Sequence, residues 1–213
     1  MSLSPQLTEI LEYRGVEGLV AAEVLTDDNE TGTGHGYTTG DVFSIAGVAE
    51  ISKAVEQSSE THYYDNLPAI VIDTVGADTI TINASAIPIE VQGKLTGQKF
   101  LSAKGALIEG GGPTAPYFAL GYKTQKTNGD TVYVWRYKGK FTLGDQTNAT
   151  KDNSATANGQ SLTYTGIDTS HKWTQNDNKG SKGIVVDGGL GLADVSTFFD
   201  TVTTPDSLAA VTP

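Results

Sequence analysis

The chain has 213 residues and no cysteine, and its 25 acidic residues against 14 basic ones give a formal net charge of −11. The lack of cysteine excludes disulfides, thiolate zinc sites and cysteine nucleophiles. The negative charge argues against a surface that grips nucleic acid, because such binding depends on lysine and arginine displacing counterions from phosphates. The same negative charge would suit a surface past which DNA moves without binding, and it also occurs in ordinary acidic proteins.

Glycine is frequent, with 25 residues, and together with abundant threonine, serine and asparagine it favours short strands joined by many turns. No run reaches the roughly 18 apolar residues of a membrane span, so we expect no membrane partner. The start of the chain, Met1 to Pro5, lacks the basic segment and apolar run of a signal peptide. We therefore expect the chain to fold in a cytoplasm.

The N-terminal part of the chain predicts an arm, two strands and a long loop. Residues 7–11 are compatible with a short helix or an extended segment, and we expect an N-terminal arm over residues 1–17. Residues 18–25 predict a strand. Residues 26–41 are polar and rich in glycine, which predicts a loop, and residues 42–46 predict a second strand.

The longest strand signal covers residues 49–64, because its apolar positions alternate. Ile51, Val55 and small residues fall on one parity. The other parity carries carboxylates and hydroxyls at Glu50, Ser52, Glu56, Ser58 and Glu60. Successive side chains of a strand point to opposite faces, so this strand has one acidic face. Taken alone, such a face is a solvated outer surface; Asp65-Asn66 ends the strand.

The clearest helix signal covers residues 86–96. Ser85 is placed to cap this helix, Pro88 falls in its first turn and Gly97 is placed to end it. Its apolar residues recur at four-residue spacing and predict a stripe that packs across a sheet. These residues are Ile87, Val91 and Leu95.

Strands separated by turns account for most of the remaining chain. Asn128-Gly129 predicts a tight hairpin turn between strands at residues 117–122 and 131–141. Residues 145–159 predict a polar loop, and a loop of this length is usually functional or disordered. We expect further strands at residues 69–74 and 79–83, paired around a turn at 75–78, and at residues 161–165, 171–174 and 183–187.

The C-terminal part completes the predicted organisation. Residues 194–202 favour a short helix stopped by Pro205, and residues 206–213 favour a flexible tail. The fold class is therefore mainly β: two packed β sheets, as a sandwich or barrel, with one flanking α-helix and a short C-terminal helix. One β domain spans residues 18–205.

Chemical motifs are weak throughout the chain. The glycine run at residues 183–193 imitates a dinucleotide fingerprint, but no second strand with an acidic residue follows it. The three histidines, His35, His62 and His171, lack metal-ligand spacing, and no Gly-x-Ser-x-Gly elbow accompanies a dispersed triad. We therefore expect no catalytic residue, no cofactor and no metal.

An aromatic ladder lies in the strand at residues 131–141. Tyr133, Trp135 and Tyr137 alternate with Val134 and Arg136. Such a ladder is most often a core or an intersubunit face, and a sugar-stacking platform is the alternative.

A set of short segments, in order along the chain, resembles the phi13-type major tail proteins, the tail-tube subunits of long-tailed phages that infect Gram-positive bacteria. The resemblance runs from about Gly15 to Pro205. The segments that carry it are residues 58–66 (SSETHYYDN), 95–98 (LTGQ), 117–122 (YFALGY), 134–141 (VWRYKGKF), 162–166 (LTYTG) and 198–205, which begins with Phe198-Phe199. The segment at residues 31–39 looks longer than is usual for the family.

The resemblance implies a tail-tube fold and a structural role in the virion, with assembly in the host cytoplasm. Subunits of such tubes form hexameric rings whose inner sheets close into one barrel, and rings stack around a tape-measure protein between a tail-tip initiator and a tail terminator. Double-stranded DNA passes through the lumen without specific binding. It also implies that the acidic strand face, with Glu50, Glu56 and Glu60, lines the lumen, and that residues 26–41 and 145–159 make inter-ring contacts.

Three other functions are compatible with the sequence. A tail-tip or baseplate protein of the same fold forms a single ring and does not polymerise. A β-sandwich carbohydrate-binding module would use the aromatic ladder. A hydrolase with a dispersed triad would need one of the three histidines.

Overall fold

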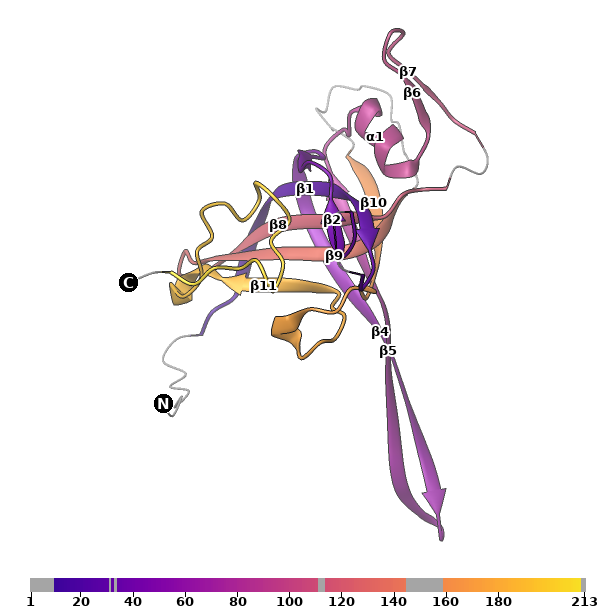
Figure 1. Ribbon diagram of the computed structural model, residues 1–213, viewed down its shortest axis with the longest axis vertical. Coiled ribbons are helices and arrows are strands. Elements are labelled where there is room, and N and C mark those ends of the chain that lie inside the picture. Colours follow the sequence, from indigo (N-terminus) through magenta and orange to yellow (C-terminus); the bar gives the residue numbers. More distant parts are fainter. Residues whose placement is uncertain (1–9, 31, 33, 111–113, 145–158, 212–213) are drawn as a thin grey trace, which may run out of the picture.

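The computed structural model describes residues 10–30, 32, 34–110, 114–144 and 159–211. Within these residues the protein is mainly β, with a large antiparallel sheet, a two-stranded sheet and one short helix (Figure 1). The large sheet contains β1 (Tyr13–Asp27), β2 (Tyr37–Thr39), β3 (Phe43–Ser44), β4 (Val48–Tyr64), β5 (Leu67–Ala84), β8 (Phe118–Lys126), β9 (Thr131–Leu143), β10 (Gln160–Ile167) and β11 (Gly183–Asp187). The other elements are β6 (Lys99–Leu101), β7 (Ala106–Ile108), the helix α1 (Ile89–Thr96) and 3-10 turns at Thr174–Asn176 and Gly188–Leu190.

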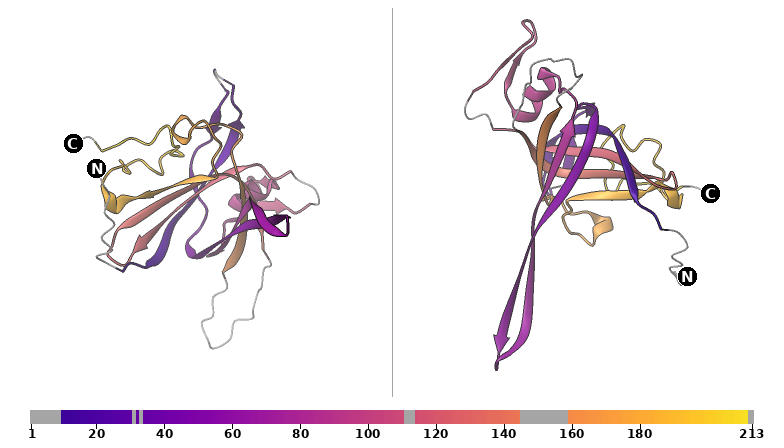
Figure 2. Two further views of the ribbon diagram at one scale, coloured as in Figure 1. Left: turned by 90° about the horizontal axis from the view of Figure 1, so that it is seen from below. Right: turned by 180° about the vertical axis from the view of Figure 1, so that it is seen from behind.

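The large sheet folds over on itself at β9, so that one hydrogen-bonded sheet makes both layers of the domain (Figure 2). Its order is β2-β1-β8-β9-β10-β5-β4. Residues 132–136 of β9 pair with β11, whereas residues 138–143 pair with β10. The β8–β9 register shifts next to this change of partner, and such a bulge bends a strand and increases its twist. We call β11, β8, β1 and the first half of β9 the first layer, and the second half of β9, β10, β5 and β4 the second layer.

The main core lies between the two layers. It combines Leu19 of β1, Leu120 of β8, Ile82 of β5 and Tyr164 of β10, each at most 1% exposed. The buried hydroxyl of Tyr164 donates a hydrogen bond to the carbonyl oxygen of Phe118 at 3.0 Å, as a buried phenol requires. This core holds the second layer against the first.

A second core covers the opposite face of the first layer. There Trp135 and Tyr137 pack against Trp173 and Phe198, so the irregular C-terminal segment covers this core. The indole Nε1 of Trp135 donates to the carbonyl oxygen of Phe198 at 2.9 Å. At its centre, around Ala21, Ala22, Ala119 and Leu120, the first layer is thus buried on both faces.

The helix begins later than the sequence indicates. It starts at Ile89 after Pro88, and Gly97 ends it in the left-handed conformation with φ 73°. The prediction that Ser85 caps it is wrong, because the Ser85 hydroxyl instead accepts a hydrogen bond from the backbone N–H of Gly47 at 3.1 Å. Of the predicted stripe, Ile87 and Leu95 are buried and Val91 packs against the main core.

The prediction of a hairpin turned at residues 75–78 is also wrong. β5 runs without interruption from Leu67 to Ala84 and pairs with β4 over nearly its whole length. The turn lies at Asp65 and Asn66, whose φ angles of 50° and 62° suit a two-residue hairpin turn. The turn signal around Gly76 marks a register shift between β4 and β5 instead.

The C-terminal segment is less regular than the sequence indicates. Residues 194–202 form hydrogen-bonded turns and no helix, because β-branched residues are frequent here and Asp194 accepts from the N–H of Ser196 at 3.0 Å. Residues 171–174 contribute one isolated bridge, Trp173 to Lys179, and no strand. From residue 206, where we expected a tail, Asp206 accepts from the N–H groups of residues 174 and 175.

Candidate functional site: assembly surfaces of the subunit

The second layer turns a polar face away from the main core. Residues directly opposite each other in a sheet share a face, and the rows here run Glu50–Asn83–Ser161, Ser52–Thr81–Thr163–Thr142 and Ala54–Thr79–Thr165–Lys140. We call these residues the polar face. The intervening rows, such as Ile51–Ile82–Leu162–Leu143, point into the core. Because the side-chain period is two, a slip of one residue would exchange these faces, so the register is strongly specified.

The residues expected to line a lumen divide between two places. Glu50 and Ser52 lie on the polar face, where the Glu50 carboxylate accepts a hydrogen bond from the side-chain amide of Asn83 at 3.1 Å. Glu56, Ser58 and Glu60 share the parity of Glu50 but lie further along β4, where it pairs with β5 alone. All five are exposed.

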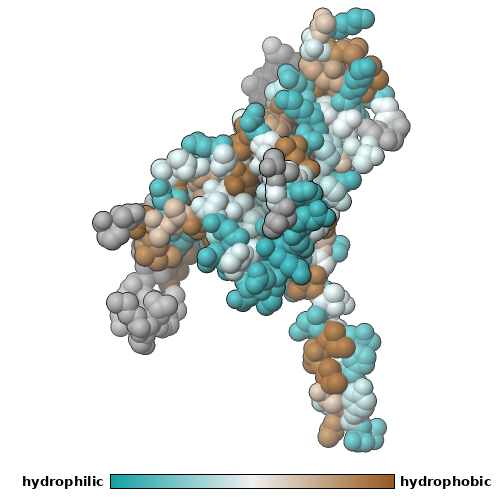
Figure 3. Space-filling model, viewed as in Figure 1, coloured by the Kyte–Doolittle hydropathy of each residue, from teal (hydrophilic) through white to brown (hydrophobic). Residues whose placement is uncertain are grey.

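Beyond residue 55, β4 and β5 leave the body of the protein as a projecting two-stranded ribbon (Figures 1 and 2). We call residues 56–76 the arm. Val71 and Ile72 are consecutive in β5 and therefore point to opposite faces of the arm, where they pair with Thr61 and Glu60. Apolar residues thus occur on both faces, and Figure 3 shows apolar and polar residues mixed along the arm. The following residues of the arm each expose at least half of their surface: Tyr63, Tyr64, Leu67, Ile70, Val71, Ile72 and Val75.

An arm of this kind is incomplete in the isolated chain. An isolated two-stranded hairpin is at best marginally stable in water, and a long exposed apolar ribbon is a site of association. The arm also contains no lysine or arginine, while it carries Glu56, Glu60, Asp65 and Asp73. The arm therefore exposes a surface that is both apolar and negatively charged.

A buried ion cluster anchors the arm at its root. The Asp78 carboxylate, 3% exposed, lies 2.9 Å from Nζ of Lys53, 3.0 Å from Nζ of Lys182 and 3.7 Å from the guanidinium of Arg136. Burial raises the pKa of Asp78, but the ion pair with Lys53 and the hydrogen bond and charge of Lys182 outweigh burial, and the pKa lies below its usual value. The cluster ties β4 and β5 to β9 and to Lys182, which immediately precedes β11.

An open cleft of about 450 Å³ lies beside this cluster, between the N-terminal half of β1 and the root of β4. Its floor is apolar, with Val132 and Val134 of β9 almost completely buried. Its lining also includes Arg14, Lys53 and Arg136. The cleft therefore combines an apolar surface with cations in a chain that is acidic as a whole.

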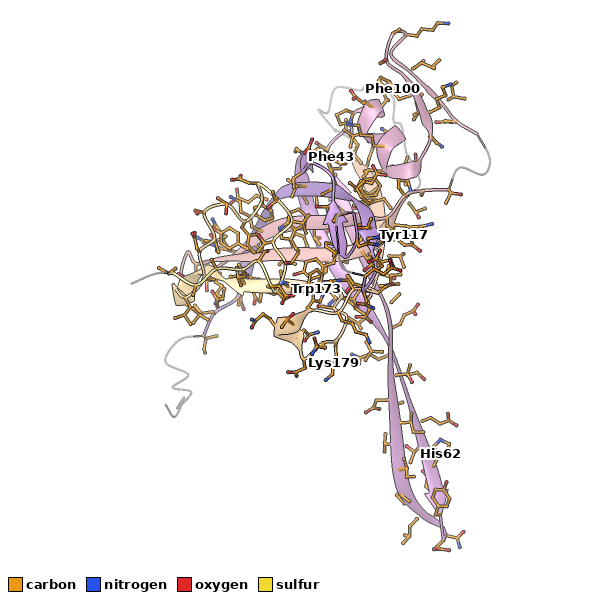
Figure 4. The ribbon with its side chains drawn as sticks, in the orientation of Figure 1. Phe43, His62, Phe100, Tyr117, Trp173 and Lys179 are labelled. Carbon is orange, nitrogen blue, oxygen red and sulfur yellow. The ribbon has the colours of Figure 1, made fainter. Side chains whose placement is uncertain are left out.

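The aromatic ladder is buried in the second core. Trp135 and Tyr137 are fully buried, and Tyr133 packs against Phe198 and Phe199. The C-terminal segment thus occupies the ring faces that a sugar would need. Figure 4 shows Trp173, which belongs to the same core, pointing into the body of the protein.

Residues 26–41, which the sequence indicates as a loop, include the end of β1 and all of β2, which pair with each other. The described part of this segment is held to the body. The Asp27 carboxylate contacts Nζ of Lys138 at 2.5 Å and accepts from the N–H groups of Ser170 and His171, each at 2.8 Å. Burial raises the pKa of Asp27, but these contacts outweigh burial and lower it. The other loop expected to join rings, at residues 145–159, lies outside the described residues except for Gly159.

The histidines occupy separate environments. His62 lies on the arm, far from the body (Figure 4); His35 contacts Asp28 and Glu30, and His171 packs edge-on against Trp173. Among the described residues, no group of histidine, aspartate and glutamate side chains is arranged to hold a metal ion. Across the same ranges, no helix is long and apolar enough to cross a membrane.

A mainly β body with a polar sheet face, a projecting apolar arm and, among the described residues, no metal-binding cluster is typical of a structural subunit. A family model described as phage tail tube protein matches residues 21–184, which is most of the chain. The chain therefore belongs to the phage tail tube protein family: it is a structural component of the virion tail and not an enzyme. No curated protein matches it.

Proposed function

We propose that hexameric rings of this protein stack into a tube whose lumen is lined by the polar face, and that the phage genome passes through this lumen. The observation that carries the proposal is the sharp division of the second layer into an apolar core side and a polar face of serine, threonine and asparagine side chains. Family membership accounts for self-assembly into a tube, and the ordered segments described above favour the phi13-type group.

The chemistry of the polar face suits the passage of DNA. Its short hydroxyl and amide side chains remain hydrated and offer no array of cations that would hold phosphates. Lys140 is part of this face, but its ammonium lies 4.7 Å from the ring centre of Tyr117, where a cation–π contact holds it. Glu50 adds negative charge at the outer strand, and we propose that Glu56, Ser58 and Glu60 extend the same lining along the arm.

The unpaired edges of the second layer provide a route to ring closure. β4 lies at the end of the strand order, and among the described residues the last part of β9, residues 140–143, pairs with β10 on one side only. Edge-to-edge pairing between copies makes a heterologous contact, which closes into a ring when the rotation allows it. Closure into a barrel also removes exposed strand edges that would otherwise aggregate.

We include a tape-measure protein, a tail-tip initiator and a tail terminator among the proposed partners, because a tube of defined length needs one protein that sets the length and others that begin and end its assembly. Residues 26–41 and 145–159 remain proposed inter-ring contacts. A single-ring tail-tip protein of the same fold is the second candidate, and the arm argues against it, since an apolar arm left unpaired on one ring would aggregate.

Negative-stain electron microscopy of the purified chain, at low and high concentration, tests assembly. We expect rings or hollow tubes at high concentration, and small particles at every concentration would refute self-assembly by this chain alone. A phage that carries Ser52→Lys and Thr163→Lys on the polar face should form tails yet eject its genome more slowly. Ser102→Lys with Gln175→Lys, at exposed sites outside that face, is the matched control. Equal ejection by both variants would refute the lumen assignment.

A further inference from the structure

The cleft beside the arm root has an unusual combination of properties for a surface feature of this chain. Val132 and Val134 form its floor and the partly exposed Val185 of β11 extends it. Arg14 and Lys53 supply cations at its walls, and Nε of Arg136 is buried without a hydrogen-bond partner among the described residues. Glu50 also lines the cleft, and Asp78 contacts both Lys53 and Arg136, so the three cations of the lining lie near two carboxylates. These features fit a ligand that is apolar and carries negative charge.

The tip of the arm has the complementary chemistry. Tyr63, Tyr64 and Leu67 expose between 60 and 67% of their surface, and the turn between them presents the Asp65 carboxylate. Tyrosine is enriched among the residues that carry most of the binding energy at protein interfaces. A cleft of about 450 Å³ accommodates a few side chains, which matches the tip and not the whole ribbon.

The geometry excludes the chain's own arm as the occupant. Lys53 lines the cleft, and twelve residues separate it from Asp65 at the tip. Strand residues advance by about 3.3 Å each, so the tip lies roughly 40 Å along the ribbon from its own cleft. The continuous pairing of β4 with β5 as far as Tyr64 and Leu67 keeps the ribbon extended.

We propose that the cleft receives the tip of the arm from a second copy of the chain, with Tyr64 and Leu67, which are paired and share one face of the ribbon, on the valine floor and Asp65 facing Arg14. The proposal rests on the self-assembly put forward above and names the two surfaces that meet. It gives the arm an apolar and cationic partner, as its composition requires. Each copy offers one tip and one cleft, so the contact is heterologous and propagates from copy to copy.

Cysteine cross-linking tests this contact cleanly, because the chain contains no cysteine of its own. Full-length chains with Asn66→Cys at the tip are mixed, under oxidising conditions at high concentration, with chains carrying Val185→Cys in the cleft. We expect a disulfide-linked heterodimer to form at least about tenfold faster than with Lys179→Cys, an exposed site outside the cleft lining (Figure 4). Equal rates for the two mixtures would overturn the docking.

A charge exchange provides a second readout. Asp65→Arg alone and Arg14→Asp alone should each slow formation of this tip-to-cleft disulfide, and the double exchange should restore it. Failure of the exchange to restore the disulfide overturns the pairing of Asp65 with Arg14. Electron microscopy of the same samples separates the two proposals: tubes that form without the tip-to-cleft disulfide would refute the docking and leave tube assembly standing, whereas the absence of any assembly would refute both.

Discussion

Replacing Asp78 by asparagine tests the ion cluster at the root of the arm. Asparagine has nearly the same volume, so no cavity forms, and the change removes the negative charge alone. Lys53, Lys182 and Arg136 would then share a pocket whose only described counter-charge has gone. We expect the substitution to destabilise the folded subunit by like-charge repulsion and by leaving desolvated cations unpaired.

The structure sets the size of the loss. Removing one partner of a buried ion pair typically costs about 3–5 kcal/mol. Lys53 is 32% exposed and its ammonium can be rehydrated, whereas Lys182 and Arg136 are 16% and 13% exposed and cannot move readily into water. We therefore expect about 3 kcal/mol, near the lower end of that range. For a domain of this size the loss corresponds to a decrease in melting temperature of roughly 6–12 °C.

Urea denaturation at neutral pH, followed by tryptophan fluorescence, measures this loss. Both tryptophans, Trp135 and Trp173, are buried in the second core and report its unfolding. The protein concentration must stay below that at which subunits associate, since association stabilises the folded state. Asp73→Asn, the same change on the exposed arm, is the control and should change the stability by less than about 0.5 kcal/mol. A loss below about 1 kcal/mol for Asp78→Asn would refute the reasoning.

Three further predictions concern the titration of Asp78 and the packing of Gly139 and Leu95. Because the pKa of Asp78 is lowered in the folded state, its contribution to stability is complete above the pKa of about 3.9 that it has in the unfolded chain, and is lost as the pH falls through the lower folded pKa. The free energy of unfolding in urea should therefore differ less between pH 7 and pH 3 in Asp78→Asn than in the wild type. Gly139→Ala should destabilise by about 2 kcal/mol or more, because its Cβ would lie 2.4 Å from the ring of Tyr164, and calorimetry should show no such loss for Gly110→Ala, which has open space. Leu95→Ala should cost about 2–5 kcal/mol in urea denaturation, because the side chain is fully buried, and a loss under about 1 kcal/mol would contradict its place in the core.

Local periodicity predicted the strands whose two faces differ chemically. The strand expected at residues 49–64 is observed at Val48–Tyr64, and the one expected at residues 131–141 at Thr131–Leu143. In both, side chains of two kinds alternate along the chain, and this alternation does not depend on which strands lie alongside. The Asn128-Gly129 turn was also predicted correctly, with Gly129 at φ 95°.

Signals that depend on distant partners were misread. Gly76 has the composition of a turn, yet the pairing of β5 with β4 continues through it as a register shift. The role of Asp78 could not be predicted for the same reason: cations from β4, from β9 and from the residue before β11 surround it, and their proximity exists only in the folded chain. The arm had one detectable signal, the absence of lysine and arginine between residues 54 and 77 while apolar residues occur on both parities.

The two halves of β4 illustrate why the same parity pattern has two structural meanings. Between Glu50 and Val55, β5 and β10 continue the sheet beside β4, so the even residues join a broad polar face and the odd residues lie on the opposite side. Beyond Val55, β10 no longer continues the sheet. The same alternation there produces a two-stranded ribbon that is exposed on both faces. Asp78 pairs with Val55 at this junction. The ion cluster therefore lies where the sheet becomes the arm, and it ties β4 and β5 at the root of the arm to Arg136 of β9.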